Sequence, residues 1–504
     1  METPHGPQPS YEECTRLAAA GRLDEALAGL RAYIEDHPDD GQALNDAGTV
    51  LFALGRAEES VGYLERAAAR LTEGRGQALW NLAEAYLAAR RPAEVVALFD
   101  DLAGDALLTP DLANRTATQC LDAGDAAAAM EALLCSLRLQ DNQEVLKPAC
   151  EVIRSKRPKV AFLCEFDDTK FVRDIARHIG ERFETRFAKG QSTDETRQLL
   201  QWCDIAWLEW CTPQVILASQ MPRTFRSIVR LHRFEAYKVW PPQVAWEHID
   251  VLVTVGNPVV VAHLKQTVPD LQRRTRLVTI PSAVDLAAWP FRERPRGKHI
   301  ACLGYLNPRK NVSLLLQCFA RLHAIDPEYR LFIGGTSQDS MLTQYVETMI
   351  GELGLAASIS MDGWQHDPAA WFADKHYVVS TSLGEGFPVS LLEGMACGLK
   401  PVVHTWPGVR DIFPGEWLFR TVDEFCDRVI SDPYEPQAYR AFAERYSLAA
   451  QLRQVNGLFL EFERNPCPKP PASPPPAARP RGDDAGTSMD AFLDQATASS
   501  RQGT

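Results

Sequence analysis

A period of about 34 residues is the feature that most restricts what the first part of this chain can form. The predicted turn positions lie 34, 35 and 34 residues apart: Gly21, Gly55, Arg90 and Gly124. Each turn separates two amphipathic helical patterns, and small and large apolar residues recur at fixed distances from it. Small side chains let helices approach closely, and large ones fill the space between them. We therefore expect stacked helix pairs over residues 8–152, because an irregular alanine-rich bundle would not keep a fixed period.

The spacing of these helix pairs resembles that of tetratricopeptide repeats, with about four of them. The resemblance implies an all-α repeat domain whose concave surface binds a peptide or protein segment.

Two sets of short β-rich runs, separated by helical patterns, follow a basic segment at residues 154–158. The first set is 159–164, 204–210, 227–232, 251–256 and 276–280, and the second is 299–304, 329–335, 358–363, 377–382 and 400–405. Strands that alternate with helices form parallel sheets with right-handed crossovers. The two sets predict two Rossmann-like domains, 158–292 and 297–464, that face each other across a cleft. Ligands bind such sheets beyond the carboxyl ends of the strands.

The remaining residues, 465–504, are rich in proline at first and in small polar residues later. This composition predicts a disordered tail, with a ligand for a proline-binding module as the alternative.

Charge and cysteine content restrict the classes of partner and compartment. The net charge is −13 at pH 7, which disfavours nucleic acid and anionic membranes as partners. The 12 cysteines are scattered, with no Cys-x-x-Cys pair and no Cys/His cluster. We therefore expect reduced thiols in a cytoplasmic protein rather than disulfides or a zinc site. The N-terminus has no signal-peptide pattern, and no apolar run approaches the roughly 18–20 residues that span a bilayer.

Residues 382–398, SLGEGFPVSLLEGMACG, carry two glutamates with seven residues between them. Glu385 lies in a Gly/Pro-rich bend. Glu393 lies within an apolar run, where burying an unpaired charge costs several kcal/mol. Such a carboxylate needs a partner that offsets its burial.

This stretch is expected to be the turn between a strand at 377–382 and a helix whose first turn contains Pro388. A helix N-terminus at the carboxyl end of a strand binds anions. Gly384 and Gly386 let a ligand approach the backbone. The carboxylate of Glu393 can accept hydrogen bonds from two hydroxyl groups, so we predict that it holds the ribose of a nucleotide.

The sequence EGFPVSLLE resembles the Glu-x7-Glu signature of retaining glycosyltransferases of the GT-B fold, family four in the usual classification. The segments 278–289, 302–322 and 363–388 resemble further family segments in the family's order. The resemblance covers residues 158 to 465. It implies an α/β GT-B fold of two facing Rossmann-like domains, preceded here by the helical repeats.

The resemblance also implies roles for single residues. Lys310 matches the lysine that contacts the donor diphosphate, and Glu385 matches the glutamate that contacts the transferred sugar. Glu393 matches the ribose-binding glutamate, and His232 matches a cleft histidine near sugar and acceptor. The implied catalytic residues are Glu385, His232 and Lys310, and the implied nucleotide-sugar-binding residues are Lys310, Arg309, Glu385, Gly386, Phe387, Pro388 and Glu393. The alternatives are structural: a solvated cation for Lys310, cap and salt-bridge residues for the glutamates, and a core position for His232.

The chain departs from the family pattern at several positions. Tyr305 stands where the family has an arginine, and Arg309 could replace that charge. Ser282 and Ala283 stand where the family has Asn-Gly, and the glycine pair expected after the first strand is missing. Two acidic residues after that strand, Asp167 and Asp168, could be read as metal ligands, but a bend or helix cap is the simpler interpretation. A weaker positive charge would stabilise a departing diphosphate less well.

The implied reaction moves a sugar from a UDP-sugar or GDP-sugar to an acceptor hydroxyl with retention, without a metal or other cofactor. The repeats would recruit a protein acceptor or a polymer-assembly partner. Two alternatives stay open. The chain could be a polysaccharide or glycolipid glycosyltransferase whose repeats serve in assembly, or a binding scaffold with a degenerate transferase half.

Overall fold

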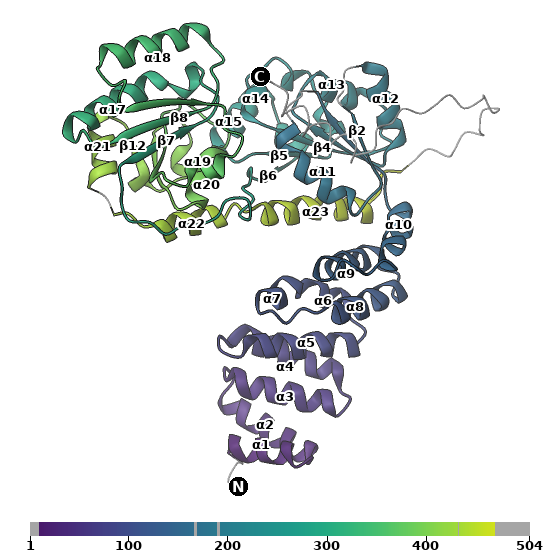
Figure 1. Cartoon of the computed structure of the whole chain (residues 1–504). Coiled ribbons are helices and arrows are strands. Elements are labelled where there is room, and N and C mark those ends of the chain that lie inside the picture. The colour runs from purple at the N-terminus through teal and green to yellow at the C-terminus, as the bar shows by residue number, and fades with distance from the viewer. Residues whose placement is uncertain (1–9, 166–168, 189–191, 432, 469–504) are drawn as a thin grey trace, which may run out of the picture. The chain divides into compact units, whose positions relative to one another are not determined.

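The computed structural model describes residues 10–165, 169–188, 192–431 and 433–468. The chain forms two compact units, residues 1–157 and 158–504 (Figure 1). Asp167 and Asp168 lie outside the described residues, and so does the predicted tail beyond residue 468.

The first unit is a stack of helices (Figure 1). In chain order they are α1 (Tyr11–Ala19), α2 (Leu23–Asp36), α3 (Gly41–Ala53), α4 (Ala57–Arg70), α5 (Arg75–Ala88), α6 (Pro92–Ala97), α7 (Phe99–Gly104), α8 (Pro110–Asp122), α9 (Ala126–Leu139) and α10 (Leu146–Lys156). The expected all-α N-terminal region is therefore confirmed.

The predicted turn positions all have a left-handed backbone, which ends one helix of a pair and starts the next. Their φ angles are 75° at Gly21, 74° at Gly55, 59° at Arg90 and 76° at Gly124. Glycine adopts this conformation without steric cost, whereas the side chain of Arg90 makes it unfavourable there.

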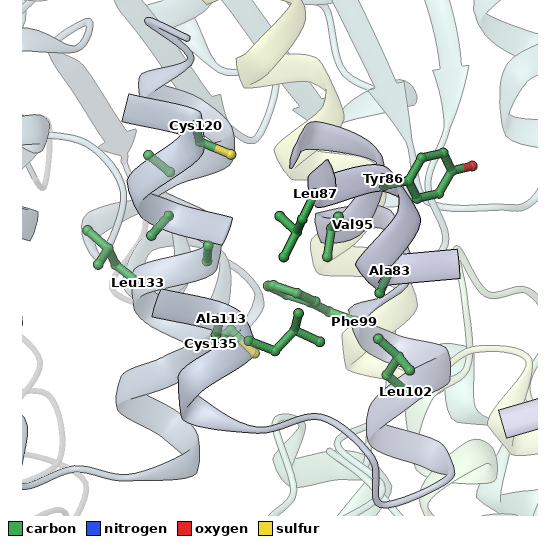
Figure 2. Close-up of a cluster of buried hydrophobic side chains, with 14 of the residues drawn as sticks. Ala83, Tyr86, Leu87, Val95, Phe99, Leu102, Ala113, Cys120, Leu133 and Cys135 are labelled. Atoms are coloured by element: carbon green, nitrogen blue, oxygen red, sulfur yellow. The ribbon is translucent and has the colours of Figure 1, made fainter. Parts of the chain in front are cut away.

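Small residues on the first helix of a pair allow close packing of the second. A Cβ atom on Gly48 of α3 would lie 2.6 Å from Leu64 Cγ of α4. Ala83 and Ala117, at the corresponding positions of later pairs, are buried. Figure 2 shows how apolar side chains of α5 to α9, including Phe99 and Leu133, fill the interior of this part of the stack.

The N-terminal half of the second unit is a parallel sheet of order β2-β1-β3-β4-β5-β6. Its elements are β1 (Val160–Cys164), η1 (Thr169–Phe171), α11 (Arg173–Gly180), β2 (Thr185–Ala188), α12 (Thr193–Trp202), β3 (Ile205–Glu209), α13 (Pro213–Gln220), β4 (Arg226–Leu231), α14 (Arg233–Ala236), η2 (Pro241–Gln243), η3 (Trp246–His248), β5 (Val251–Thr254), α15 (Pro258–Thr267), α16 (Leu271–Arg274) and β6 (Arg276–Thr279).

The C-terminal half is a second parallel sheet, of order β12-β11-β10-β7-β8-β9. Its elements are β7 (His299–Leu303), η4 (Pro308–Lys310), α17 (Val312–Ile325), β8 (Arg330–Gly334), α18 (Ser340–Glu352), β9 (Ile359–Gly363), α19 (Pro368–Phe372), β10 (Tyr377–Ser380), α20 (Val389–Ala396), β11 (Lys400–His404), η5 (Val409–Asp411), η6 (Gly415–Trp417), β12 (Leu418–Phe419), α21 (Val422–Ile430), α22 (Pro436–Glu444) and α23 (Leu448–Arg464).

Each sheet has one point where the direction of strand addition reverses. In the N-terminal half β1 and β3 are neighbours, and in the C-terminal half β7 and β10 are neighbours. Loops that leave such a pair at its carboxyl ends diverge and open a crevice for a ligand. This topology brings the segments after β7 and β10 together. The prediction of two Rossmann-like sheets is confirmed.

The last helix differs from its predicted place. Residues 448–464 were assigned to the C-terminal half, but the apolar face of α23 packs into the N-terminal core, where Phe459 stacks on Trp207 at 6.1 Å. The chain thus crosses between the halves twice, at residues 280–298 and at 445–447. The two crossings are hydrogen-bonded side by side, from Val284 N to Tyr446 O at 3.0 Å and from Leu448 N to Val284 O at 2.8 Å.

Among the helices of the described ranges, none combines the length and the apolar character that crossing a bilayer requires.

Candidate functional site

A cavity of about 860 Å³ is lined by both halves of the α/β unit. It lies beside the loops that leave the carboxyl ends of β7 and β10, as the sequence predicts for a parallel sheet. Its lining residues include Lys170, Arg173, Arg177 and Arg230 of the N-terminal half, and Tyr305, Arg309, Lys310, Glu385 and Glu393 of the C-terminal half.

Glu385 is buried at the centre of a cluster of donors. One carboxylate oxygen accepts hydrogen bonds from Lys310 Nζ at 2.7 Å and Ser382 Oγ at 2.7 Å, and the other accepts from Arg309 at 2.5 Å. Burial alone would raise the pKa of Glu385, but the charges of Lys310 and Arg309 lower it below the ordinary value. The carboxylate is therefore ionised at neutral pH.

The two loops that carry this cluster are joined through their backbones. Leu383 N donates to Arg309 O at 2.8 Å, and Thr381 Oγ1 donates to Lys310 O at 2.9 Å. The two cations are thereby fixed beside the bend that contains Glu385.

Glu393 lies on α20 and lines the same cavity. Burial raises the pKa of its carboxyl to about 7, and the nearby charge of Lys170 only partly opposes this. Within the described ranges, no hydrogen-bond donor or salt-bridge cation is recorded for this carboxylate. A carboxylate in this state can accept hydrogen bonds from a ligand that enters the cavity.

The first turn of α20 also faces the cavity, because Pro388, Val389 and Ser390 are among its lining residues. No side chain caps this helix N-terminus. Val389 N and Leu391 N donate to Phe387 O and Pro388 O, whereas Ser390 N has no acceptor among the described residues. Ser390 N and the positive end of the helix dipole can therefore bind an anion.

Gly386 and Phe387, also predicted as site residues, have different surroundings. Phe387 lines the cavity and packs against Tyr446 with ring centroids 5.0 Å apart. Gly386 is not among the lining residues. A Cβ atom there would lie 3.1 Å from Arg233 Cβ, so glycine allows the bend to pack against the N-terminal half.

His232 is buried and is not among the residues that line the cavity. Its Nε2 lies 2.6 Å from Glu209 Oε1, and its backbone N–H donates to the Glu235 carboxylate at 2.6 Å at the start of α14. The ring also stacks on Trp210 at 4.0 Å. The neighbouring residue, Arg233, packs against the bend at Gly386, but among the described residues no hydrogen bond joins the His232 ring to Glu385. The catalytic role of His232 stays a prediction.

Glu209 is the buried carboxylate of the N-terminal half. Besides the imidazole of His232, it contacts Trp207 Nε1 at 2.8 Å and Arg230 at 3.4 Å. Burial alone would raise its pKa, but Arg230 and His232 lower it. Arg230 also donates to Phe171 O at 2.7 Å and lines the cavity.

Tyr305, which stands at the position of the family's arginine, lines the cavity as an aromatic side chain. Its ring lies 5.6 Å from that of Trp364, and Lys170 Nζ lies 5.5 Å from its centroid. Arg309 supplies its charge to Glu385 rather than to the space beside Tyr305.

Sequence reasoning missed Glu209, Arg230 and Arg173. The first two carry the signal that singled out Glu393, a charged residue within an apolar run, here DIAWLEW and SIVRLH. Arg173 carries no comparable signal. Among the described residues, no group of three or more His, Cys, Asp or Glu side chains is placed to hold a metal ion.

Residues 297–431 match the family model described as glycosyl transferases group 1. Two curated relatives share short segments with the chain. An N-acetylgalactosaminyltransferase of Campylobacter jejuni, which acts on a diphospho-undecaprenol-linked sugar by its name, is 29% identical over 119 residues, 23% of this chain and 31% of that protein. A mannosylfructose-phosphate synthase of Agrobacterium fabrum is 28% identical over 149 residues, 28% of this chain and 31% of that protein.

A third relative, an exopolysaccharide phosphotransferase of Streptomyces coelicolor, is 33% identical over 134 residues, 26% of this chain and 13% of that protein. The chain thus spans between 13% and 31% of the length of these curated relatives.

Two solved structures resemble the α/β unit. HepE of Anabaena in complex with UDP has a TM-score of 0.51 and 13% identity, and the match covers 60% of this chain and all of that one. A glycosyltransferase of Rickettsia africae has a TM-score of 0.50 and 13% identity, and the match covers 62% of this chain and all of that one. The α/β unit therefore has the GT-B fold, which confirms the predicted fold class.

Proposed function

We propose that the protein is a glycosyltransferase that moves a sugar from a nucleoside-diphosphate sugar to an acceptor hydroxyl. One observation carries the proposal: the charged cluster around Glu385 shares a cavity with Glu393 and with the uncapped N-terminus of α20. Together these groups suit a sugar, a diphosphate and a ribose. The group 1 family match over residues 297–431 supports the assignment. The UDP named in the HepE structure supports UDP as the first nucleotide to test.

In the proposed reaction, the bond between the anomeric carbon and the departing phosphate oxygen breaks on the face that the acceptor oxygen attacks. The acceptor hydroxyl loses its proton to that phosphate oxygen, so the product retains the anomeric configuration. This is the retaining, family-four type of mechanism. Lys310, Arg309 and the N-terminus of α20 would stabilise the developing negative charge on the diphosphate. Glu385 would orient the sugar and stabilise positive charge at its ring.

The same cluster provides two cations for the diphosphate without a metal ion. We therefore propose that transfer needs no resident metal or other cofactor. Activity should survive a chelator. A loss of activity that a divalent ion restores would contradict this part of the proposal.

The direct test uses full-length protein with a panel of UDP-sugars and GDP-sugars. We expect nucleotide binding and slow donor hydrolysis in wild-type protein, and loss of hydrolysis in Lys310→Ala. Glu424→Ala is the matched control, because Glu424 is ion-paired with Arg420 in the same half and does not line the cavity. No binding of any nucleotide sugar by wild-type protein would contradict the proposal.

We propose that the helix pairs are tetratricopeptide-like repeats that recruit a protein acceptor or a polymer-assembly partner. Deleting residues 1–150 should leave donor hydrolysis intact, because the α/β unit has its own cores. Transfer to a macromolecular acceptor should fall sharply, because the repeats raise the acceptor's effective concentration. Equal transfer by full-length and truncated protein would show that the repeats do not recruit the acceptor.

Two observations favour the alternatives. The relative that acts on a diphospho-undecaprenol-linked sugar favours a glycolipid or polysaccharide acceptor. Tyr305, together with the pairing of both cations to Glu385, favours a scaffold that no longer binds a diphosphate. Recovery of a glycosylated protein from cells would favour a protein acceptor over the glycolipid or polysaccharide. Donor hydrolysis by the purified protein would exclude the scaffold without activity.

We also propose a cytoplasmic location. All twelve cysteines are free thiols, and ten of them are buried. Such thiols suit a reducing compartment.

A further inference from the structure

The N-terminal wall of the cavity carries an excess of positive charge. Before the crossing its charged lining residues are four cations and one carboxylate, Lys170, Arg173, Arg177, Arg230 and Asp174, and the crossing adds the carboxylate of Asp285. The chain as a whole has a net charge of −13. The excess therefore does not follow from the general composition.

The cations of this wall differ in how far the protein itself satisfies them. Arg230 is buried and held by Glu209 and by Phe171 O. Arg177 pairs with Asp174 at 3.2 Å and is more than half exposed, so water screens this pair. Arg173 differs from both. Its Nε atom is buried and has no hydrogen-bond acceptor among the described residues.

The opposite wall shows no such excess. There Arg309 and Lys310 are both paired with Glu385, and Glu393 adds a second carboxylate. The positive charge that the protein neutralises least is thus at α11, where Arg173 and the solvent-screened Arg177 are four residues apart and both line the cavity.

We propose that Arg173 and Arg177 bind an anionic group, a phosphate or a carboxylate, carried by the acceptor. The inference rests on the proposed function, because it assigns the second substrate of that same cavity. A guanidinium presents a planar fork of N–H donors that matches either group. An incoming oxygen would also satisfy the buried Arg173 Nε, which costs free energy while it has no acceptor.

The acceptor is favoured over the donor as the source of this anion because of where the other groups lie. Glu393, Lys310 and the N-terminus of α20, which suit the nucleotide and its diphosphate, all belong to the C-terminal half. An anion at α11 would lie on the other wall, contributed by a different half of the unit.

The test uses full-length protein saturated with UDP, so that the nucleotide site is occupied, and inorganic tripolyphosphate as the anionic probe. Calorimetry should detect tripolyphosphate binding to this complex. Arg173→Gln combined with Arg177→Gln should weaken that binding about tenfold or more, the scale of a lost charged hydrogen bond. UDP affinity should stay within about twofold. Arg173→Lys should recover part of the affinity, because it restores the charge without the fork.

Arg197→Gln is the matched control. Arg197 pairs with Asp194 at 3.2 Å on α12, as Arg177 pairs with Asp174, but it does not line the cavity. The control should bind tripolyphosphate like wild-type protein. Unfolding curves should show no loss of stability in any variant, since these side chains are not part of a core and Arg173 Nε has no acceptor to lose.

Three results would overturn the inference. They are the absence of tripolyphosphate binding to the UDP complex, equal binding by wild-type and doubly substituted protein, and a parallel loss of UDP affinity that assigns the arginines to the donor. Failure of the proposed function looks different, because wild-type protein would then bind no nucleotide. Titration of the nucleotide-free protein with tripolyphosphate would then still test whether Arg173 and Arg177 bind an anion.

Discussion

Glu209 at the end of β3 and Glu393 on α20 are carboxylates in apolar surroundings, one in each half of the α/β unit. Glu209 is in contact with Trp207, Arg230 and His232, and its pKa is lowered although burial opposes this. Glu393 has no donor recorded within the described ranges, and burial raises its pKa to about 7. Glu209 is fully buried and satisfied by the protein, whereas Glu393 is partly buried and faces the cavity without a partner from the described residues.

This difference separates a carboxylate with a structural role from one that is available to bind a ligand. A buried charge whose partners all come from the protein fixes the local structure and has nothing left to offer a ligand. A carboxylate without partners that lines a cavity is available to one. Glu385 lies between these cases, since its donors are protein cations that also face the cavity.

Removing the Glu209 side chain should have the largest effect, on stability. Glu209→Ala leaves Arg230 buried without its counter-ion, and we expect the free energy of unfolding to fall by about 3–5 kcal/mol. Urea denaturation measures this. Glu209→Leu combined with Arg230→Met should recover most of the loss, because the pair is replaced by apolar volume. If the single variant is as stable as wild-type protein, the network around Glu209 is not structural.

Glu385→Ala should act mainly on turnover. Its charge is expected to matter most in the transition state, so kcat should fall by about 10²–10³-fold while KM for the donor changes less. Steady-state kinetics with the best donor measure both. A rise in KM with kcat unchanged would place Glu385 with the binding groups instead.

Glu393→Gln should change nucleotide affinity and leave the fold intact, in contrast to the substitution of Glu209. We expect binding to weaken by about 1–3 kcal/mol, the scale of a hydrogen bond to a charged group. Calorimetric titration with UDP checks this. Unchanged affinity for UDP would show that Glu393 does not bind the ribose.

The pH dependence of stability should show the smallest effect. The carboxyl of Glu393 titrates at about 7 in the folded protein and near 4.3 when unfolded. The folded state therefore holds the proton between these values, and stability falls as pH rises through that window. Between pH 5 and pH 6.5 wild-type protein should lose roughly 1–2 kcal/mol relative to Glu393→Gln. Parallel pH profiles of the two proteins would show that Glu393 titrates normally.

The sequence was a good guide where hydrophobic pattern decides the structure. The turn period and the alternation of strands with helices predicted both units. The pattern did not reveal β2 or β12. β2 has only partly buried or exposed residues at one edge of its sheet, and β12 has two residues. Neither contains enough apolar residues in a row to be recognised.

For the site, the sequence placed Arg309, Lys310, Glu385 and Glu393 in one region, and the structure brings them to one cavity. It could not predict that the His232 ring pairs with Glu209 inside the protein. That depends on Glu209, which is on another strand. Likewise, the Glu209–Arg230 pair exists because β3 and β4 are neighbours in a register that sets these residues opposite each other.

The paired chain crossings at Val284 and Tyr446 have a mechanical consequence. Two connections that are hydrogen-bonded side by side act as one hinge axis, about which the halves can rotate without breaking either connection. Sliding of one half past the other would shear these bonds and pull Phe459 of α23 from its apolar packing. The easiest movement is therefore a change in the opening angle of the cavity, which alters the distance between the cations of α11 and the carboxylate of Glu385.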